Sequence, residues 1–203
     1  VNEWVARDIT GYSLGYYGGD YKSIAPTSFE AAIGSGNAFS NAVKPLYNGN
    51  IAYTVTSIEK EASLPELVPQ AAVYTYDQLQ RLKSMRVFRA NDLSNTNSWG
   101  NSAETQAYSS SYTYDENGNL MTLLRKGNST DGLAMDNFTY NYMNVAGAPS
   151  NRLQRVVDAE TASSANYDDI KHGQISNNYQ YDKLGQLVKD IQEGIEEIQW
   201  SFG

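Results

Sequence analysis

The chain has 203 residues, a formal net charge of −8 and no cysteine. Without cysteine it can form neither disulfides nor thiolate-based catalytic or metal sites, and the scattered acidic charge argues against a nucleic-acid partner, because phosphate neutralisation needs clustered Lys and Arg. No apolar run reaches the ~18 residues that a membrane-spanning helix needs, so we also expect no membrane span.

The composition favours strands over helices. Tyrosine and glycine each occur 16 times. Tyrosine suits half-buried pleated strands, and glycine suits the tight turns that join them. We therefore predict an all-β protein of successive antiparallel β-hairpins in an extended curved sheet.

Residues 1–69 are predicted to form a Tyr/Gly-rich β segment that precedes the clear repeats. An opening strand is expected around Trp4, Val5 and Ile9. The tyrosines at positions 12, 16, 17 and 21 stand among glycines, which let backbones approach closely or turn with positive φ. We expect these tyrosines to be buried in a core; the alternative is a platform of exposed tyrosines that stack against sugar rings.

The rest of this segment carries three shorter signals. Phe29–Ile33 predicts a single helical turn, which is too short for a domain element. Leu46–Ile51 contains an Asn-Gly pair and predicts a hairpin whose strand continues through Tyr53 and Val55. Glu59–Pro69 is acidic, holds two prolines and predicts a connecting loop.

Residues 70–203 are predicted to be hairpin repeats of one phrase, truncated at the C-terminal end. The phrase is clearest at Tyr112–Leu120, where two tyrosines on one strand face lead into an acidic Asn-Gly turn and a leucine opens the return strand. A strand pattern followed by Asn-Gly is the strongest short-range hairpin signal. Similar phrases occur at Tyr74–Leu82 and Tyr179–Leu187, and in all three the second tyrosine stands six residues before the leucine.

A fourth copy pairs Phe138–Asn141 with Asn151–Leu153 and inserts seven residues, including Ala148–Ser150. We expect a lengthened turn between unchanged strands here. The structural repeat positions predicted from the four copies are Tyr74, Tyr76, Asp77, Leu82, Tyr112, Tyr114, Asp115, Gly118, Leu120, Phe138, Tyr140, Leu153, Tyr179, Tyr181, Asp182, Gly185 and Leu187. An aspartate that recurs at one place in a repeat indicates a turn role, with its carboxylate accepting from nearby backbone N–H groups.

Polar connections separate the hairpins, which are expected near residues 73–88, 108–126, 136–158 and 179–191. Asn91–Thr105 is nearly devoid of aliphatic residues and predicts a mobile surface loop. Gly127–Gly132 and Ala159–Gln174 predict two further connections. The basic residues of the first repeat would be split between two strand faces and are interpreted as solvated charge; they are Arg81, Lys83, Arg86 and Arg89.

No catalytic, cofactor-binding or metal-binding residue is predicted. Asp115–Asn119 begins like a calcium loop, but Leu120 and Lys126 stand where an EF-hand needs glycine and glutamate. His172 is the only histidine, and we interpret it as a solvated loop residue rather than the base of a Ser-His-Asp site.

Two adjacent carboxylate pairs, Asp168-Asp169 and Glu196-Glu197, are the candidates for glycoside hydrolysis. Neighbours on a strand point to opposite faces, so neither pair is placed to converge on one bond.

The last residues predict a truncated strand. Ile198, Trp200 and Phe202 alternate as one face. An exposed strand edge that carries Trp and Phe is an aggregation hazard that natural chains normally cover. We therefore expect these residues to belong to a segment of a longer polypeptide.

The repeated phrase resembles the bacterial YD repeat, also called the RHS repeat. Its signature of Tyr-Asp, then Gly, a polar residue and Leu matches residues 114–120 and 181–187, while residues 76–82 depart at the glycine. Phrases at 15–21, 46–52 and 199–203 resemble the subfamily in very large secreted proteins of Gram-negative bacteria. The resemblance therefore runs nearly end to end.

This resemblance implies a structural role. In the YD/RHS family the hairpins wind as a spiral strip into a hollow shell, which commonly encloses a C-terminal toxin or effector. We expect a wall segment of a secreted or cell-surface protein, with the remainder of its parent chain, an enclosed toxin domain and a secretion-system component as partners. The family's aspartate-based autoproteolytic motif has no counterpart here, so no protease activity is carried over.

Two other interpretations remain open. The chain could be an adhesin-like β-repeat module of the cell surface, whose aromatic stripes and polar loops bind glycans or a protein. It could also be an export substrate bound to a secretion machine. Neither interpretation calls for a cofactor.

Overall fold

The computed structural model of the chain describes residues 10–21, 35–58, 68–90, 98–128, 134–160, 170–171 and 173–201. The chain divides into two compact units, Val1–Ser109 and Ser110–Gly203. The boundary falls inside strand β5 (Ala103–Tyr114). It lies further along the chain than residue 70, where the repeats are predicted to begin.

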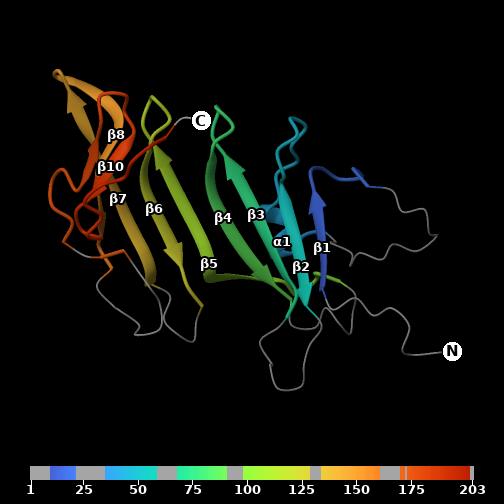
Figure 1. The fold of residues 1–203 in the computed structure, drawn as a ribbon. Coiled ribbons are helices and arrows are strands. Elements are labelled where there is room, and N and C mark those ends of the chain that lie inside the picture. The colour runs from blue at the N-terminus through green and yellow to red at the C-terminus, as the bar shows by residue number, and fades with distance from the viewer. Residues whose placement is uncertain are drawn as a thin grey trace. The chain divides into compact units, whose positions relative to one another are not determined.

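The first unit is built on antiparallel strands that pair in chain order (Figure 1). Its elements are β1 (Thr10–Gly15), the short helix α1 (Ala38–Ala42), β2 (Tyr53–Ile58), β3 (Gln70–Tyr76), β4 (Leu82–Arg89) and the first part of β5. In β3, Ala71 and Val73 are buried while Tyr74 and Tyr76 on the other face are half-buried. This alternation is the period of two that the sequence pattern predicts.

The second unit begins with the end of β5. It contains β6 (Leu120–Lys126), β7 (Ala134–Val145), β8 (Ala148–Asp158) and a separate two-stranded sheet of β9 (Tyr179–Tyr181) and β10 (Leu187–Asp190). Each pair is antiparallel. The prediction of an all-β chain of successive antiparallel hairpins is confirmed.

A hydrophobic core lies on one face of the first unit's sheet. Its buried members are Phe39, Ala52, Tyr53, Ala71, Val73, Phe88, Ala90 and Trp99. The ring centroid of Phe39 lies 5.0 Å from that of Trp99. It lies 5.4 Å from the Tyr53 ring and 5.9 Å from the Phe88 ring. Burial of one phenylalanine stabilises by about 1.5–3 kcal/mol, so this side chain of α1 is a main link between helix and sheet.

Helix α1 was not predicted from the sequence. Its N-cap Asn37 accepts from the Ser40 N–H at 2.9 Å, and Ser40 Oγ accepts from the Asn37 N–H at 3.2 Å. Ser102 ties this cap to the start of β5, because its Oγ donates to Asn37 Oδ1 at 3.1 Å and accepts from the Phe39 N–H at 3.1 Å. The reciprocal cap is the only local signal for so short a helix.

The prediction of a mobile surface loop over Asn91–Thr105 is wrong for the part that the structure describes. Trp99 is only 1% exposed and belongs to the core. Residues 103–105 already belong to β5. A lone tryptophan among polar residues gives no periodicity, which is why its burial could not be read from the sequence.

The predicted hairpin at Leu46–Ile51 is only partly present. Gly49 makes the Asn-Gly turn with φ of 86°, and Tyr53 and Val55 lie in β2 as expected. However, Leu46–Ile51 is not a strand. The Leu46 N–H donates to the Tyr16 carbonyl at 2.8 Å, and the strand partner of β2 on this side is β1.

Several sequence predictions fall outside the described residues. They are the opening strand around Trp4, Val5 and Ile9, the helical turn at Phe29–Ile33, most of the Glu59–Pro69 loop, most of the Gly127–Gly132 turn and much of the Ala159–Gln174 connection.

The glycines of β1 permit close packing, but the tyrosines beside them are not core residues. A Cβ on Gly15 would lie 2.0 Å from Cζ of the buried Tyr53 ring, so the ring packs directly on the glycine backbone. Tyr12 is 79% exposed and Tyr21 is 52% exposed. The expectation of buried tyrosines is therefore wrong at these positions.

We expect Gly15→Ala to lower the free energy of unfolding by about 1–3 kcal/mol, the usual cost of overpacking. The added methyl must displace the Tyr53 ring or separate β1 from β2. Gly11→Ala is the matched control, because it lies on the same strand and nothing lies within 4 Å of its added Cβ. Chemical denaturation of both variants measures the difference; equal stabilities would contradict the packing role of Gly15.

Candidate functional site

The predicted tyrosine and leucine positions face each other across three hairpins. The facing pairs are Tyr76–Leu82, Tyr114–Leu120 and Tyr181–Leu187. In each hairpin the residue after the leucine has no opposite partner and forms a β-bulge; these residues are Lys83, Met121 and Val188. A bulge interrupts the hydrogen-bond ladder and increases the local twist. Each copy of the repeated sequence therefore forms the same backbone structure, a Tyr–Leu pair followed by a bulge.

Asp77 closes the turn of the first repeat hairpin. Its N–H donates to the Arg81 carbonyl at 2.9 Å, and its carbonyl accepts from the Gln80 N–H at 3.0 Å. Its Oδ1 accepts from the N–H groups of Leu79 and Arg81, both at 2.9 Å. Gln80 has φ of 63°, so this copy places a glutamine in the left-handed conformation that favours glycine.

Asp182 makes the same set of contacts in the last repeat hairpin. Its N–H donates to the Gln186 carbonyl at 2.9 Å, and its carbonyl accepts from the Gly185 N–H at 3.1 Å. Its Oδ1 accepts from the N–H of Leu184 at 2.8 Å and of Gln186 at 2.9 Å. Gly185 supplies the positive φ, at 87°. These are the contacts that the sequence predicts for a turn aspartate.

Asp115 closes the middle turn in a related way. Its N–H donates to the Asn119 carbonyl at 3.0 Å, and its carbonyl accepts from the Gly118 N–H at 3.2 Å. The Asn119 N–H donates to Oδ1, and the Asn119 side-chain amide donates to Oδ2, both at 2.8 Å. The carboxylate is committed to its own turn.

These contacts lower the pKa of two of the aspartates. The backbone N–H of Arg81 is the main cause that holds the pKa of Asp77 below its ordinary value of 3.8. At Asp115, partial desolvation raises the pKa, but the combined hydrogen bonds from Asn119 and its neighbours outweigh it and hold the pKa below 3.8. Both groups therefore stabilise the folded turn in their charged form.

A tyrosine hydroxyl connects one hairpin to the element before it. Tyr76 donates to the carbonyl of Ile51 at 3.0 Å, and Tyr181 donates to the carbonyl of Leu153 at 3.0 Å. Tyr142 donates to the carbonyl of Leu120 at 2.9 Å. In each case the donor stands on the first strand of its hairpin, and the acceptor belongs to the segment that precedes that hairpin in the chain. We call this contact the junction hydrogen bond.

Burial is the largest cause that raises the pKa of Tyr76, Tyr142 and Tyr181 above the ordinary value of 10.0. The three hydroxyls therefore remain protonated donors at neutral pH. They can maintain the junction hydrogen bonds throughout the physiological range.

The structure corrects the alignment of the fourth copy. Leu153 stands opposite Tyr142, not Tyr140, and the bulge residue after it is Gln154. The Tyr-x-Tyr spacing of Tyr140 and Tyr142 matches the other copies and is the signal that the alignment on Phe138 missed.

The turn of the fourth copy is also shorter than predicted. The strands β7 and β8 extend to Val145 and from Ala148, and Ala146-Gly147 alone turns the chain with φ of 52° and 83°. The strands have been lengthened and the turn kept short, which is the reverse of the expectation.

Trp200 makes the same kind of contact at the last hairpin. Its indole N–H donates to the carbonyl of Leu187 at 2.9 Å, and the Ile198 N–H donates to the carbonyl of Val188 at 2.9 Å. The segment thus runs beside β10, but residues 196–201 are not a strand. The predicted truncated strand is wrong over these residues, and Phe202 lies outside the described part of the chain.

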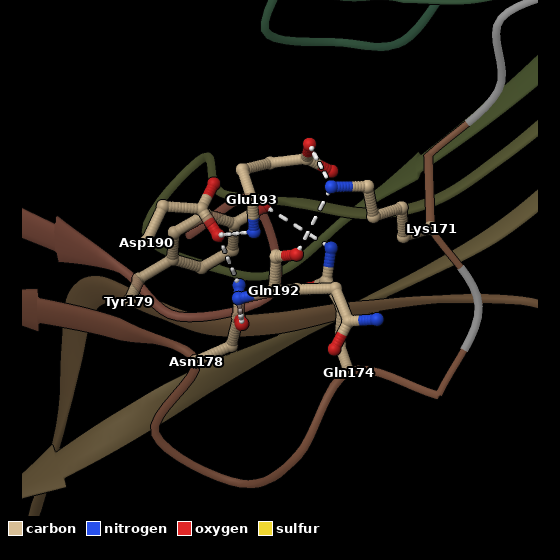
Figure 2. Close-up of polar contacts among 7 residues, drawn as sticks. All are labelled: Lys171, Gln174, Asn178, Tyr179, Asp190, Gln192 and Glu193. Atoms are coloured by element: carbon tan, nitrogen blue, oxygen red, sulfur yellow. Dashed lines mark hydrogen bonds and ion pairs between the residues drawn. The ribbon is translucent and has the colours of Figure 1, made fainter. Parts of the chain in front are cut away.

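A cluster of polar side chains joins the two ends of the last hairpin in the second unit (Figure 2). Asn178 is fully buried at its centre. Its Nδ2 donates to Asp190 Oδ1 at 3.0 Å, and its Oδ1 accepts from the Gln192 N–H at 2.8 Å. Lys171 approaches the same loop, with Nζ 2.9 Å from Glu193 Oε2.

Gln174 connects this cluster to β8. Its Oε1 accepts from the Val156 N–H at 2.8 Å, and its Nε2 donates to the Tyr179 hydroxyl at 3.4 Å. Figure 2 shows these groups turned toward one another and toward main-chain atoms. The cluster holds the loops on either side of the hairpin to the strands. From the sequence, its residues could be recognised only as part of a polar connection.

The other sequence candidates give no convergent site. Glu196 and Glu197 are exposed, whereas Asp168, Asp169 and His172 lie outside the described residues. Within the described ranges, no group of three or more metal-ligating side chains gathers. The same part of the chain contains no helix long and apolar enough to cross a membrane.

The basic residues of the first repeat are not uniformly solvated. Arg81 Nε lies 2.6 Å from Asp77 Oδ2, and Arg86 pairs with Glu104 of β5. The Arg89 guanidinium lies 5.8 Å from the Tyr108 ring centroid. Arg81 and Arg86 are therefore paired charges, although their side chains remain 26% and 42% exposed.

Comparison of the chain with protein-family models, with curated proteins and with solved structures finds no match. The resemblance to the YD repeat therefore rests on the repeated residues themselves.

We expect Tyr142→Phe and Tyr181→Phe each to lower the free energy of unfolding by about 1–2 kcal/mol, because a partly buried carbonyl loses its donor. Tyr12→Phe is the control, since its ring is 79% exposed and its hydroxyl makes no hydrogen bond to the described residues. Urea denaturation measures all three. A control loss as large as the junction losses would show that the hydroxyl bonds contribute nothing specific.

We expect the free energy of unfolding to fall as the pH drops below 3.8, through the lower folded-state pKa values of Asp77 and Asp115. A carboxyl group with a depressed folded-state pKa stabilises the fold above its unfolded pKa and loses that contribution on protonation. Asp77→Asn and Asp115→Asn should flatten this acid dependence in denaturation series. The exposed neighbour Glu116→Gln is the control, and an unchanged acid dependence in both aspartate variants would refute the assignment.

Proposed function

We propose that this chain is a structural segment of a large secreted or cell-surface YD/RHS-repeat protein. Its hairpins form part of the wall of a β-shell that encloses a C-terminal toxin or effector. The observation that carries the proposal is the junction hydrogen bond, which recurs from Tyr76, Tyr142 and Tyr181 to the preceding element. A wall built by repetition needs one contact that joins each unit to its neighbour.

The recurring polar side chains support the same role. Asp77, Asp115 and Asp182 bond the backbone of their own turns, and the junction tyrosines bond the backbone of the preceding element. Residues that recur for a shared ligand would direct their polar atoms toward that ligand. These residues direct them toward the main chain, which favours assembly over binding or reaction.

Strand length points to dependence on neighbours. β9 has three residues and β10 has four. An isolated two-stranded hairpin is at best marginally stable in water, so a pair this short needs support from β8 and from the segment that carries Trp200. The partners proposed from the YD-repeat resemblance are the remainder of the parent chain, the enclosed domain and the machinery that exports them.

We expect the native gene product, taken from the secreted or surface fraction and weighed intact by mass spectrometry, to be several times longer than 203 residues. Limited proteolysis of that product should leave a C-terminal domain protected. Tyr142→Phe with Tyr181→Phe should speed its digestion, because junctions between hairpins are weakened, while Tyr12→Phe should not.

A product no larger than this chain would refute the proposal. The proposal would also be refuted if the C-terminal domain were digested as fast within the full-length product as it is when free.

A further inference from the structure

Two tyrosines on neighbouring turns of the first unit present an open aromatic face. The rings of Tyr17 and Tyr47 are stacked, with centroids 4.8 Å apart and planes inclined by 27°. Tyr47 is nevertheless 78% exposed and Tyr17 is 38% exposed. Because one face of the Tyr47 ring lies against Tyr17, so large an exposed fraction requires that its other face be open to solvent.

Both rings stand on fixed turns. The Asp20 carboxylate accepts from the N–H groups of Tyr16 at 2.5 Å and Tyr17 at 3.4 Å, and the Asp20 N–H donates to the Tyr17 carbonyl at 3.3 Å. The Leu46 N–H donates to the Tyr16 carbonyl at 2.8 Å, which ties one turn to the other immediately before each ring. The stacked pair is therefore preorganised, which reduces the entropy cost of binding.

An exposed amide side chain comes next to the open ring in the sequence. Asn48 follows Tyr47 in the chain and is exposed. Its Oδ1 accepts from the Asn50 N–H at 3.1 Å, which fixes the side chain, and its Nδ2 donates no hydrogen bond to the described residues. A donor held beside a flat apolar surface can orient a ligand that has hydroxyl groups around a flat apolar face.

We propose that the Tyr17–Tyr47 pair is a carbohydrate-binding platform, on which a pyranose ring of an uncharged glycan stacks while the Asn48 amide donates to its hydroxyls. A sugar ring offers the flat C–H face that matches an exposed aromatic face, and the tyrosine hydroxyls keep the platform soluble when empty. The net charge of −8 disfavours anionic polysaccharides. Anchors of protein interfaces instead fill desolvated pockets, which an open stacked pair does not supply.

This site is independent of the wall role, because it uses none of the junction or turn residues. Tyr16, which the sequence placed among the candidate platform residues, is half-buried. The structure replaces it in the platform by Tyr47.

The test applies the 203-residue chain to an array of neutral oligosaccharides of glucose, galactose, mannose and N-acetylglucosamine, followed by titration with the best-bound sugar. We expect Tyr47→Ala to weaken binding by about tenfold, as the loss of one stacked ring implies. Tyr47→Trp should retain binding, because it keeps a flat face. Tyr12→Ala is the matched control, with a ring that is equally exposed at 79%.

Circular dichroism and denaturation of each variant establish that the fold is kept, which the exposure of Tyr47 leads us to expect. No binding to any sugar on the array would overturn the proposal. Unchanged binding by Tyr47→Ala, or an equal loss in Tyr12→Ala, would overturn it as well.

Discussion

A tyrosine hydroxyl that donates to a main-chain carbonyl of the preceding element is the contact on which the repeated part of this protein depends. Tyr142 and Tyr181 donate to the leucines that stand just before a bulge, Leu120 and Leu153. A bulge interrupts ladder bonding, and a partly buried carbonyl without a donor destabilises the fold. The aromatic residue supplies that donor and, with the same side chain, covers apolar surface. The bulge, the leucine and the tyrosine thus act together as one structural unit.

Beyond these contacts, the two units are stabilised in different ways. In the first, Phe39 and Trp99 place aromatic rings against the sheet, and the packing is that of an ordinary hydrophobic core. In the second, the fully buried Asn178 and the buried Gln174 hold loop to strand through hydrogen bonds. A buried amide is tolerated there because both of its ends find partners. Strand pairing alone therefore does not account for the stability of either unit.

The hairpins could be predicted from the sequence because their signals are local: a strand pattern, an aspartate and a residue with positive φ stand within a few positions of each other. Trp99 and α1 could not, because a single tryptophan and a five-residue helix have no periodicity, and their burial depends on distant partners. The fourth hairpin was aligned with the other copies on Phe138 and Tyr140 instead of Tyr140 and Tyr142. Its strands extend further beyond Tyr142 than the sequence pattern suggested. The stacking of Tyr17 and Tyr47 could not be predicted either, because the two rings come from turns that are far apart in the sequence.

The acceptor of every junction hydrogen bond described is a main-chain oxygen, offered by an isoleucine in one case and by leucines in the others. A peptide oxygen is the same whichever side chain it carries, so a junction places no demand on the identity of its acceptor. Trp200 shows that the donor can change as well, since an indole serves where a phenol does elsewhere. Hairpins joined in this manner are interchangeable. When gene duplication or deletion adds or removes a whole hairpin, the new neighbours can still form the junction hydrogen bond. Such an array can therefore change length without first evolving a new interface.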